Sequence, residues 1–207
     1  MAKDVCVLLD TGSIGQAIIR RIGAGKHVVL ADLRIENAEK AAKILEDAGF
    51  EASAISVNLG SRDDILALIE HAQKYGAVKY LVNAAGVSPS QASVQDILRV
   101  DLYGTAVLLE EFGKVIDEGG SGVVISSQSG HRLGALSEEE NTQLATSPAE
   151  ELLRLPFITA ITDTLKAYQY SKRCNVLRVM YEASRWSKRG ATASYWYGDL
   201  QYLKATH

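Results

Sequence analysis

Hydrophobic residues occur along this chain in short uninterrupted runs, separated by longer segments in which they recur at helical spacing. Five runs have the length and composition of buried strands: residues 5–9, 27–31, 51–57, 78–82 and 122–125. Between the first two runs, Ile14, Ile18 and Ile22 lie four residues apart and share one face of a helix. This alternation predicts a parallel sheet with helices on both faces.

The remaining pattern extends the same architecture. Helices are expected at residues 36–48, 91–117 and 161–188, and a sixth strand is expected at 191–197. Connections between neighbouring parallel strands are right-handed, so few topologies fit this order. The simplest is an α/β fold with a doubly wound parallel sheet of about six strands, a Rossmann fold, in one domain that spans residues 1–207.

Residues 131–160 depart from this alternation. Ser137-Glu138-Glu139-Glu140 and Ser147-Pro148-Ala149-Glu150 both match the capping box, in which a serine caps a helix and a glutamate three residues later bonds back. Pro148 suits the first position of the second helix. We therefore expect a small helical insertion of two short helices at the edge of the active-site cleft, with a mobile surface loop as the alternative.

The turn after the first strand carries most of a phosphate-binding fingerprint. In G-x-G-x-x-G, the glycines let the backbone approach a pyrophosphate, and the helix N-terminus supplies amide donors. Gly12 and Gly15 occupy the second and third glycine positions, with Ser13 and Ile14 between them, but Asp10 occupies the first. Since a carboxylate is unfavourable beside a pyrophosphate, an ordinary strand-to-helix turn is an equal alternative.

Asp32 ends the second strand, about 20 residues beyond this turn. A carboxylate at this point accepts hydrogen bonds from the adenosine ribose and repels a phosphate carried by that ribose. Asp32 therefore predicts NAD as the cofactor. Arg34 lies two residues further on and could support NADP instead, and a capping or turn role is the alternative for Asp32.

Tyr168 and Lys172 lie four residues apart on the long predicted helix and therefore share one face. An alcohol that loses hydride must also lose its hydroxyl proton to a nearby base. Free tyrosine, with a pKa of about 10, is a poor base near pH 7, but a neighbouring ammonium stabilises the phenolate. Ser127, at the end of the fifth strand, could donate a hydrogen bond to the substrate oxygen. Alternatively, the tyrosine and lysine are a surface pair and the serine is a turn residue.

Composition narrows the functional class. The formal net charge of −3 gives no support for nucleic-acid binding, and no apolar run is long enough to span a bilayer. No signal peptide precedes the first strand-like run, so a cytoplasmic protein without a membrane partner is expected. Cys6 and Cys174 lie in apolar segments, which indicates buried thiols in a reducing compartment. The four histidines lack metal-ligand spacing, so no metal is expected.

Three segments, taken in this order, are similar to motifs of the short-chain dehydrogenase/reductase family: Asn83-Ala84-Ala85-Gly86, Ser127-Gln128-Ser129-Gly130, and Tyr168 to Lys172. The resemblance runs from about residue 5 to residue 190. It implies that Tyr168 is the general acid/base, that Lys172 binds the nicotinamide ribose and assists Tyr168, and that Ser127 orients the substrate.

The resemblance also implies a set of cofactor contacts and shows departures from the family pattern. Asn58 stands where the family often has an aspartate that contacts adenine, and Asp101 stands where it has an asparagine of the proton relay. Asp101 is therefore a further candidate catalytic residue. The expected cofactor site comprises Gly12, Ser13, Ile14, Gly15, Asp32, Leu33, Asn58, Leu59, Asn83, Ala84, Ala85, Gly86, Tyr168 and Lys172.

The insertion resembles that of a hydroxysteroid-dehydrogenase-like bacterial subgroup. The family normally continues after its sixth strand with a Pro-Gly turn, a substrate-binding loop and a seventh strand. Residues 191–207 do not resemble that continuation, so a truncated or frameshifted product without a seventh strand is expected, with Tyr195, Trp196 and Tyr197 partly exposed.

The resemblance implies an NAD(P)-dependent oxidoreductase that transfers hydride between a nicotinamide cofactor and a small secondary alcohol or ketone. Two alternatives stay open: an NADP-dependent reductase of a carrier-bound or cyclic carbonyl, and a catalytically impaired dinucleotide-binding remnant. Family members commonly form dimers through their two long helices. A homodimer is therefore expected, with five residues offering apolar surface: Leu108, Leu109, Phe112, Leu177 and Val179.

Overall fold

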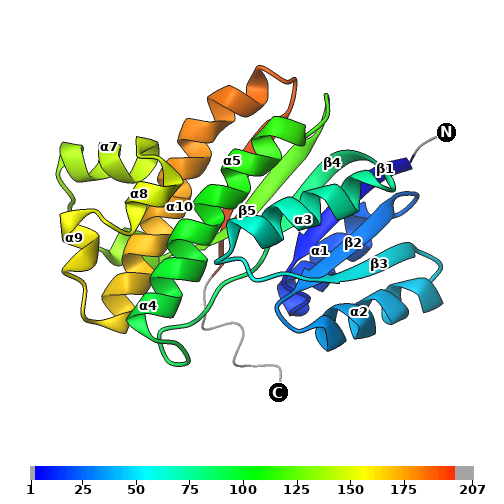
Figure 1. Cartoon of the computed structure of the whole chain (residues 1–207), viewed down its shortest axis with the longest axis horizontal. Helices are drawn as coiled ribbons and strands as arrows, with labels where there is room; N and C mark the ends of the chain where they lie inside the picture. Colours follow the sequence, from blue (N-terminus) through cyan, green and yellow to red (C-terminus); the bar gives the residue numbers. More distant parts are fainter. Residues whose placement is uncertain (1–2, 199–207) are drawn as a thin grey trace.

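A six-stranded parallel sheet forms the centre of the molecule, a computed structural model that describes residues 3–198 (Figure 1). The strands are β1 (Lys3–Leu9), β2 (His27–Asp32), β3 (Glu51–Ser56), β4 (Gly76–Asn83), β5 (Ser121–Ser127) and β6 (Thr192–Gly198). They lie in the order β3-β2-β1-β4-β5-β6, and every neighbouring pair is parallel. This confirms the predicted doubly wound fold. The direction of winding reverses between β1 and β4, where open α/β sheets bind ligands.

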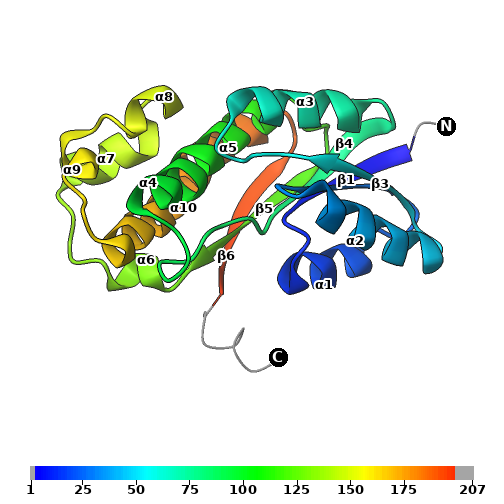
Figure 2. The same cartoon turned by 60° about the horizontal axis from the view of Figure 1, so that its bottom comes forward.

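Helices cover both faces of the sheet (Figures 1 and 2). Helices α1 (Ser13–Ile22) and α2 (Ile35–Asp47) lie on one face, and α3 (Arg62–Gln73), α5 (Thr105–Val115) and α10 (Thr164–Ser187) lie on the other. The alternation of side chains along β1 explains this division, because Cys6 and Leu8 pack toward α1 and α2 whereas Val5, Val7 and Leu9 join the opposite core. All five of these side chains are buried, as expected of a central strand.

The predicted helix at 91–117 is divided into three parts. A single helical turn, α4 (Val94–Ile97), leads into η1 (Leu98–Gly104), a π-helix, which continues as α5. Gly104 lets the end of η1 approach the segment after β3 closely, since an added Cβ there would lie 2.4 Å from the backbone oxygen of Leu59. A π-helix places an extra residue in a turn and often marks a functional site; here it carries Asp101.

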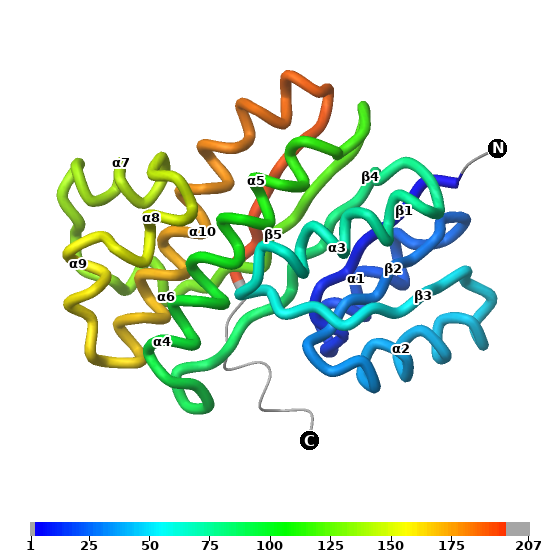
Figure 3. The backbone as a smooth tube through the Cα atoms, in the orientation of Figure 1, coloured from blue at the N-terminus to red at the C-terminus, as the bar shows by residue number. Residues whose placement is uncertain are grey.

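Helices α5 and α10 pack side by side on the sheet, although they are far apart in the sequence (Figure 3). Trp186 fills the space between them and β5: it is fully buried, and its Nε1 donates a hydrogen bond to the Leu109 oxygen at 3.2 Å. Two glycines make room for the indole, because an added Cβ would lie 2.7 Å from its Nε1 at Gly113 and 2.6 Å from its Cη2 at Gly122.

This packing corrects the prediction of which residues face a partner. Leu108, Leu109, Phe112 and Val179 are buried within the single chain, and Leu177 is partly buried against the same core. They pack inward because α5 and α10 cover the sheet with these side chains. The apolar residues that α10 exposes are Leu165, Met180 and Tyr181.

The region at 131–160 is a helical insertion, as predicted. After α6 (Ser129–Arg132) it contains α7 (Glu138–Thr146), α8 (Ala149–Leu152) and α9 (Pro156–Thr159), one helix more than expected. The first capping box is confirmed: the Glu140 amide donates to Ser137 Oγ at 3.1 Å, and the Ser137 amide donates to Glu140 Oε2 at 2.8 Å. The alternative of a surface loop is therefore wrong.

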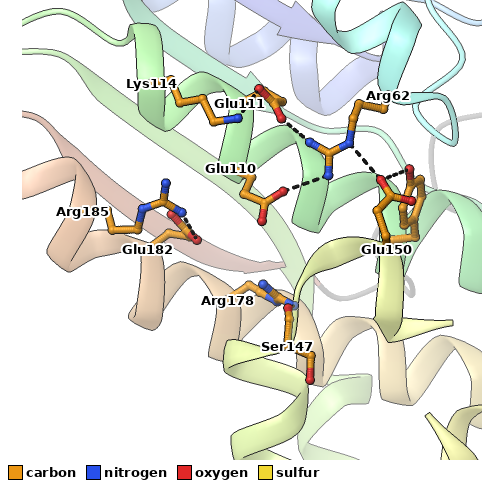
Figure 4. Close-up of polar contacts among 10 residues, drawn as sticks. Arg62, Glu110, Glu111, Lys114, Ser147, Glu150, Arg178, Glu182 and Arg185 are labelled. Carbon is orange, nitrogen blue, oxygen red and sulfur yellow. Dashed lines mark hydrogen bonds and ion pairs between the residues drawn. The ribbon is translucent and has the colours of Figure 1, made fainter. Parts of the chain in front are cut away.

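The second capping box is wrong, because other groups bind the residues that would form it (Figure 4). Glu150 accepts hydrogen bonds from Arg62 Nε on α3 and from the Tyr103 hydroxyl, both at 2.8 Å. The Ser147 carbonyl accepts a hydrogen bond from Arg178 of α10. Pro148 is the N-cap of α8 rather than its first residue, and it makes no side-chain cap.

Arg62 connects the insertion to the main domain (Figure 4). Besides Glu150, its guanidinium pairs with Glu110, at 2.9 Å, and with Glu111 on α5, and Lys114 also pairs with Glu111. The network therefore joins α3, α5 and α8. None of these residues lines the cavities described below.

Strand β6 confirms the expected sixth strand and lies at the edge of the sheet, beside β5 (Figure 2). Tyr195 packs partly against the core, whereas Trp196 is 56% exposed, as predicted for these aromatic residues. The expectations for residues 199–207 lie outside the described part of the chain. Between residues 3 and 198, no helix has the length and hydropathy needed to cross a membrane.

Candidate cofactor and active site

Two cavities open at the carboxyl ends of the central strands. The first, about 300 Å³, is lined by Asp10, Gly12, Ser13, Ile14, Ala84, Ala85, Gly86, Val87, Ser88, Gln91, Ile125, Ser126, Tyr168 and Lys172. The second, about 140 Å³, is lined by Leu9, Asp10, Ala31, Asp32, Leu33, Val57, Asn58, Leu59, Ala85, Gly86, Val87 and Val100. They share Asp10 and the segment 85–87, so they form two halves of one elongated site across the point where the winding reverses.

The turn at 10–15 has the form of a phosphate cradle. Gly12 is the N-cap of α1, so the first amides of this helix face the site. Gly15 lets helix and strand approach closely, since an added Cβ would lie 2.5 Å from the Asp10 oxygen and 2.7 Å from Leu8 Cδ1. Asp10 takes the left-handed conformation, with φ of 68°, that a glycine adopts readily in a tight turn. The backbone therefore fits a dinucleotide, but its first position carries a carboxylate.

Asp32 lies at the end of β2, with its carboxylate fixed by neighbouring donors. Its Oδ2 accepts hydrogen bonds from the Thr11 hydroxyl at 2.7 Å and the Thr11 amide at 3.2 Å. Its Oδ1 accepts from the Arg34 amide at 3.1 Å and from Asn37 Nδ2 at 3.2 Å. Burial by itself would raise the pKa of Asp32, but these donors outweigh it and hold the pKa below its usual value. Asp32 is thus a fixed anion on the wall of the second cavity.

Tyr168 and Lys172 come together on the wall of the first cavity, as their spacing predicts. Both are almost fully buried, and Lys172 Nζ lies 5.3 Å from the centre of the Tyr168 ring. Both side chains are therefore placed to contact a ligand in this cavity.

Asp101 lies behind Lys172, carried there by η1. Its Oδ2 is 3.7 Å from Lys172 Nζ and has no hydrogen-bond partner among residues 3–198, whereas its Oδ1 accepts a hydrogen bond from the Val87 amide at 2.9 Å. Burial raises the pKa of Asp101, and the charge of Lys172 and the Val87 bond oppose that effect. Gly86 leaves space beside these two side chains, since an added Cβ would lie 3.2 Å from Lys172 Nζ and 3.3 Å from Asp101 Oδ1.

Four predicted site residues do not line either cavity, namely Asp101, described above, and Gly15, Asn83 and Ser127. Gly15 packs against β1, as described above. Asn83 is buried, donates to the Thr105 hydroxyl at 3.3 Å and accepts from the Ala85 amide at 3.2 Å, so it shapes the segment after β4. Ser127 is buried and its Oγ accepts a hydrogen bond from the Ser129 amide at 3.2 Å. These contacts leave their functional roles as predictions.

Sequence reasoning missed several residues that the structure brings to the cavities. Ser126 lines the first cavity, and its hydroxyl donates to the Lys172 backbone oxygen at 3.0 Å, which ties β5 to α10. Ser88 and Gln91 line it from the loop after β4, where no motif points to a function. Within residues 3–198, no cluster of three or more histidine, cysteine or acidic side chains is arranged to hold a metal.

Comparisons with known proteins agree with this geometry. The sequence profile described as short chain dehydrogenase matches residues 3–137. The chain is 36% identical over 193 residues to the short-chain dehydrogenase/reductase bsc3 of Alternaria brassicicola, a match that covers 92% of this chain and 70% of that protein. It is 32% identical over 140 residues to dehydrogenase/reductase SDR family member 4 of Bos taurus, covering 60% of this chain and 49% of that protein.

The fold is also similar to solved structures. Superposition on a variant of actinorhodin polyketide ketoreductase, solved with NADPH, gives a TM-score of 0.69 at 22% identity and covers 93% of this chain and 69% of that one. A short-chain dehydrogenase from Mycobacterium smegmatis gives 0.71 at 18% identity, covering 96% and 77%. At these identities the likeness concerns the fold.

Proposed function

Because the chain belongs to the short-chain dehydrogenase family, we propose that it is an NAD-dependent oxidoreductase that interconverts a secondary alcohol and its ketone. The observation that carries this proposal is the position of Tyr168 and Lys172 on the wall of a cavity whose other lining includes the phosphate cradle at 12–14. Asp32, on the wall of the second cavity, favours NAD because its fixed charge repels a ribose phosphate.

In this proposal each side chain has a separate task. A bound nicotinamide accepts or supplies the hydride. Tyr168 takes the hydroxyl proton during alcohol oxidation and returns it during ketone reduction. Lys172 stabilises the phenolate and, with Gly86 leaving room beside it, contacts the nicotinamide ribose. Ser127 donates to the substrate oxygen, since its hydroxyl accepts the Ser129 amide and keeps its own hydrogen to donate, and Asp101 holds Lys172 in place.

Cofactor choice tests the assignment of Asp32. We expect NADH to bind at least about tenfold more tightly than NADPH, because bringing a phosphate next to a fixed carboxylate costs more than about 1.4 kcal/mol. Fluorescence titration with both cofactors measures the ratio. Asp32→Ala should reduce this preference, whereas Asp63→Ala, an exposed position on α3 outside both cavities, should leave it unchanged.

Two outcomes contradict parts of this proposal. Equal or tighter binding of NADPH would indicate that Arg34, rather than Asp32, determines the choice of cofactor, and would favour the NADP-dependent alternative. NADH binding without reduction or oxidation of any secondary alcohol or ketone, followed by the absorbance of the reduced nicotinamide, would favour the dinucleotide-binding remnant.

We also propose a homodimer, formed through the outer surfaces of α5 and α10. The adjacent residues Met180 and Tyr181 of α10 are 62% and 43% exposed, and contiguous exposed apolar surface of this kind can mark a contact with another chain. Light scattering should give twice the mass of one chain, and Met180→Glu should shift the protein to monomer. A monomer for the unsubstituted protein would overturn the proposal.

A further inference from the structure

We propose that Asp10 couples dinucleotide binding to the uptake of one proton, so that the site takes its cofactor only when this carboxyl group is neutral. The inference rests on the proposed cofactor site and concerns the one position of the cradle where the chain carries an acid. The proton would then be a second ligand of the site, and its binding would be coupled to that of the cofactor.

The position of Asp10 places its carboxylate in the path of the diphosphate. Asp10 lines both cavities described above and also a third, about 250 Å³, formed with residues of α1 and α2. An adenosine in the second cavity and a nicotinamide in the first must be joined across this residue. Asp10 Oδ2 would lie 3.0 Å from a Cβ added at Gly12, and Oδ1 accepts the Gly12 amide at 3.3 Å. The carboxylate thus covers the glycine that a phosphate would approach.

The backbone that carries this side chain is held in place. The Asp10 amide donates to the Ala31 oxygen at 2.9 Å, and φ is fixed in the left-handed region. Gly15 is packed against the Asp10 carbonyl, so the turn cannot shift without disturbing α1. A negatively charged diphosphate would therefore meet the carboxylate at close range, in a partly desolvated site where repulsion is strong.

The charges around Asp10 do not neutralise it. Within residues 3–198 no ion pair involves Asp10; the titratable groups that share its cavities are Asp32 on β2, Lys40 on α2, and Tyr168 and Lys172 on α10. Burial and, next, the charge of Asp32 raise the pKa of Asp10 to about 6, against the opposing Gly12 hydrogen bond. Near neutral pH most of the free protein therefore carries the ionised form, and one proton must be taken up before the diphosphate can bind.

The sign of the pH dependence follows from linkage. A site that binds only with Asp10 protonated loses affinity as pH rises above about 6, by up to about tenfold for each pH unit. Below that value the carboxyl group is already neutral and affinity becomes independent of pH. A diphosphate has no ionisation of its own in this range, so the slope reports on the protein.

The test is NADH binding measured by fluorescence between pH 6.0 and pH 8.5. We expect the dissociation constant of the unsubstituted protein to rise at least about tenfold over this range. Asp10→Asn keeps the shape and the left-handed conformation but cannot ionise, so its dissociation constant should stay within about twofold. Asp63→Asn, an exposed acid on α3, is the matched control and should keep the slope of the unsubstituted protein.

Calorimetry in two buffers of different ionisation enthalpy provides a second readout. At pH 8 the unsubstituted protein should take up close to one proton per NADH bound, and Asp10→Asn close to none. NADH binding that is independent of pH, or a slope that survives in Asp10→Asn, would overturn the proposal and leave the proposed function standing. Failure of both proteins, and of Asp10→Gly, to bind NADH at any pH would contradict the cofactor site itself.

Discussion

Replacing Tyr168 by phenylalanine should lower kcat by about 1,000-fold or more, while the dissociation constant of NADH changes less than about twofold. The substitution removes only the hydroxyl group, so the ring keeps its place beside Lys172 and the shape of the cavity is preserved. What is lost is the hydroxyl group to which the proposed function assigns the proton of the alcohol. Steady-state turnover of a secondary alcohol, combined with NADH titration, measures both effects.

Tyr170→Phe is the matched control for this experiment. Tyr170 is also nearly buried and lies two residues further along α10, but it packs against Phe157 of α9 and lines neither of the two cavities of the site. Its hydroxyl should therefore be dispensable for turnover. If Tyr168→Phe keeps most of its activity, the role assigned to Tyr168 is wrong, and equal losses in both variants would point to a general effect of the substitution on α10.

Replacing Trp186 by alanine should destabilise the protein by about 3–5 kcal/mol, the usual cost of deleting a large aromatic side chain from a core. The indole is fully buried between α5, α10 and β5, and its Nε1 binds the Leu109 oxygen. The glycines at 113 and 122, shaped to receive the ring, cannot fill the space that it leaves. Urea unfolding followed by circular dichroism measures the change in the free energy of unfolding.

Trp196→Ala is the matched control for Trp186→Ala. Trp196 is 56% exposed at the edge of the sheet, so the same chemical deletion there should change the free energy of unfolding by less than about 1 kcal/mol. A cost at Trp186 no larger than that at Trp196 would show that the packing of α5 against α10 contributes little to stability.

The sequence predicts the architecture because the buried strands and the amphipathic helices leave distinct periodic patterns. It also predicts that Tyr168 and Lys172 share a wall and that Asp32 ends β2, since both follow from position within a single element. The failures concern contacts between distant segments. Glu150 fits a capping box locally, but Arg62, far away in the sequence, binds it instead. Leu108 and Phe112 look available on a helix considered alone, but the sheet covers them.

The two serines at the end of β5 illustrate a further limit. Both are nearly buried, yet Ser126 lines the cavity whereas the Ser127 hydroxyl binds the amide at the start of α6. The motif identifies Ser127 alone, but the twist of the strand and the turn that follows decide which hydroxyl faces the site. The sequence likewise does not predict the direction of the Asp10 side chain. That direction depends on a left-handed backbone conformation at a position where the motif has glycine.

The order of the strands has a consequence for synthesis on the ribosome. Strands β1 to β4 all lie within the first 83 residues and are contiguous in the sheet, so four of its six strands can assemble early. β5 can join β4 once Ser127 has emerged, but its other neighbour begins only at Thr192. At about 5–20 residues per second, the outer edge of β5 stays open for several seconds while the insertion and α10 are made. An open strand edge pairs readily with another chain. Misassembly is therefore most favoured before β6 has been made. The vulnerable surface is the free edge of β5, which lies between β4 and β6 in the folded protein.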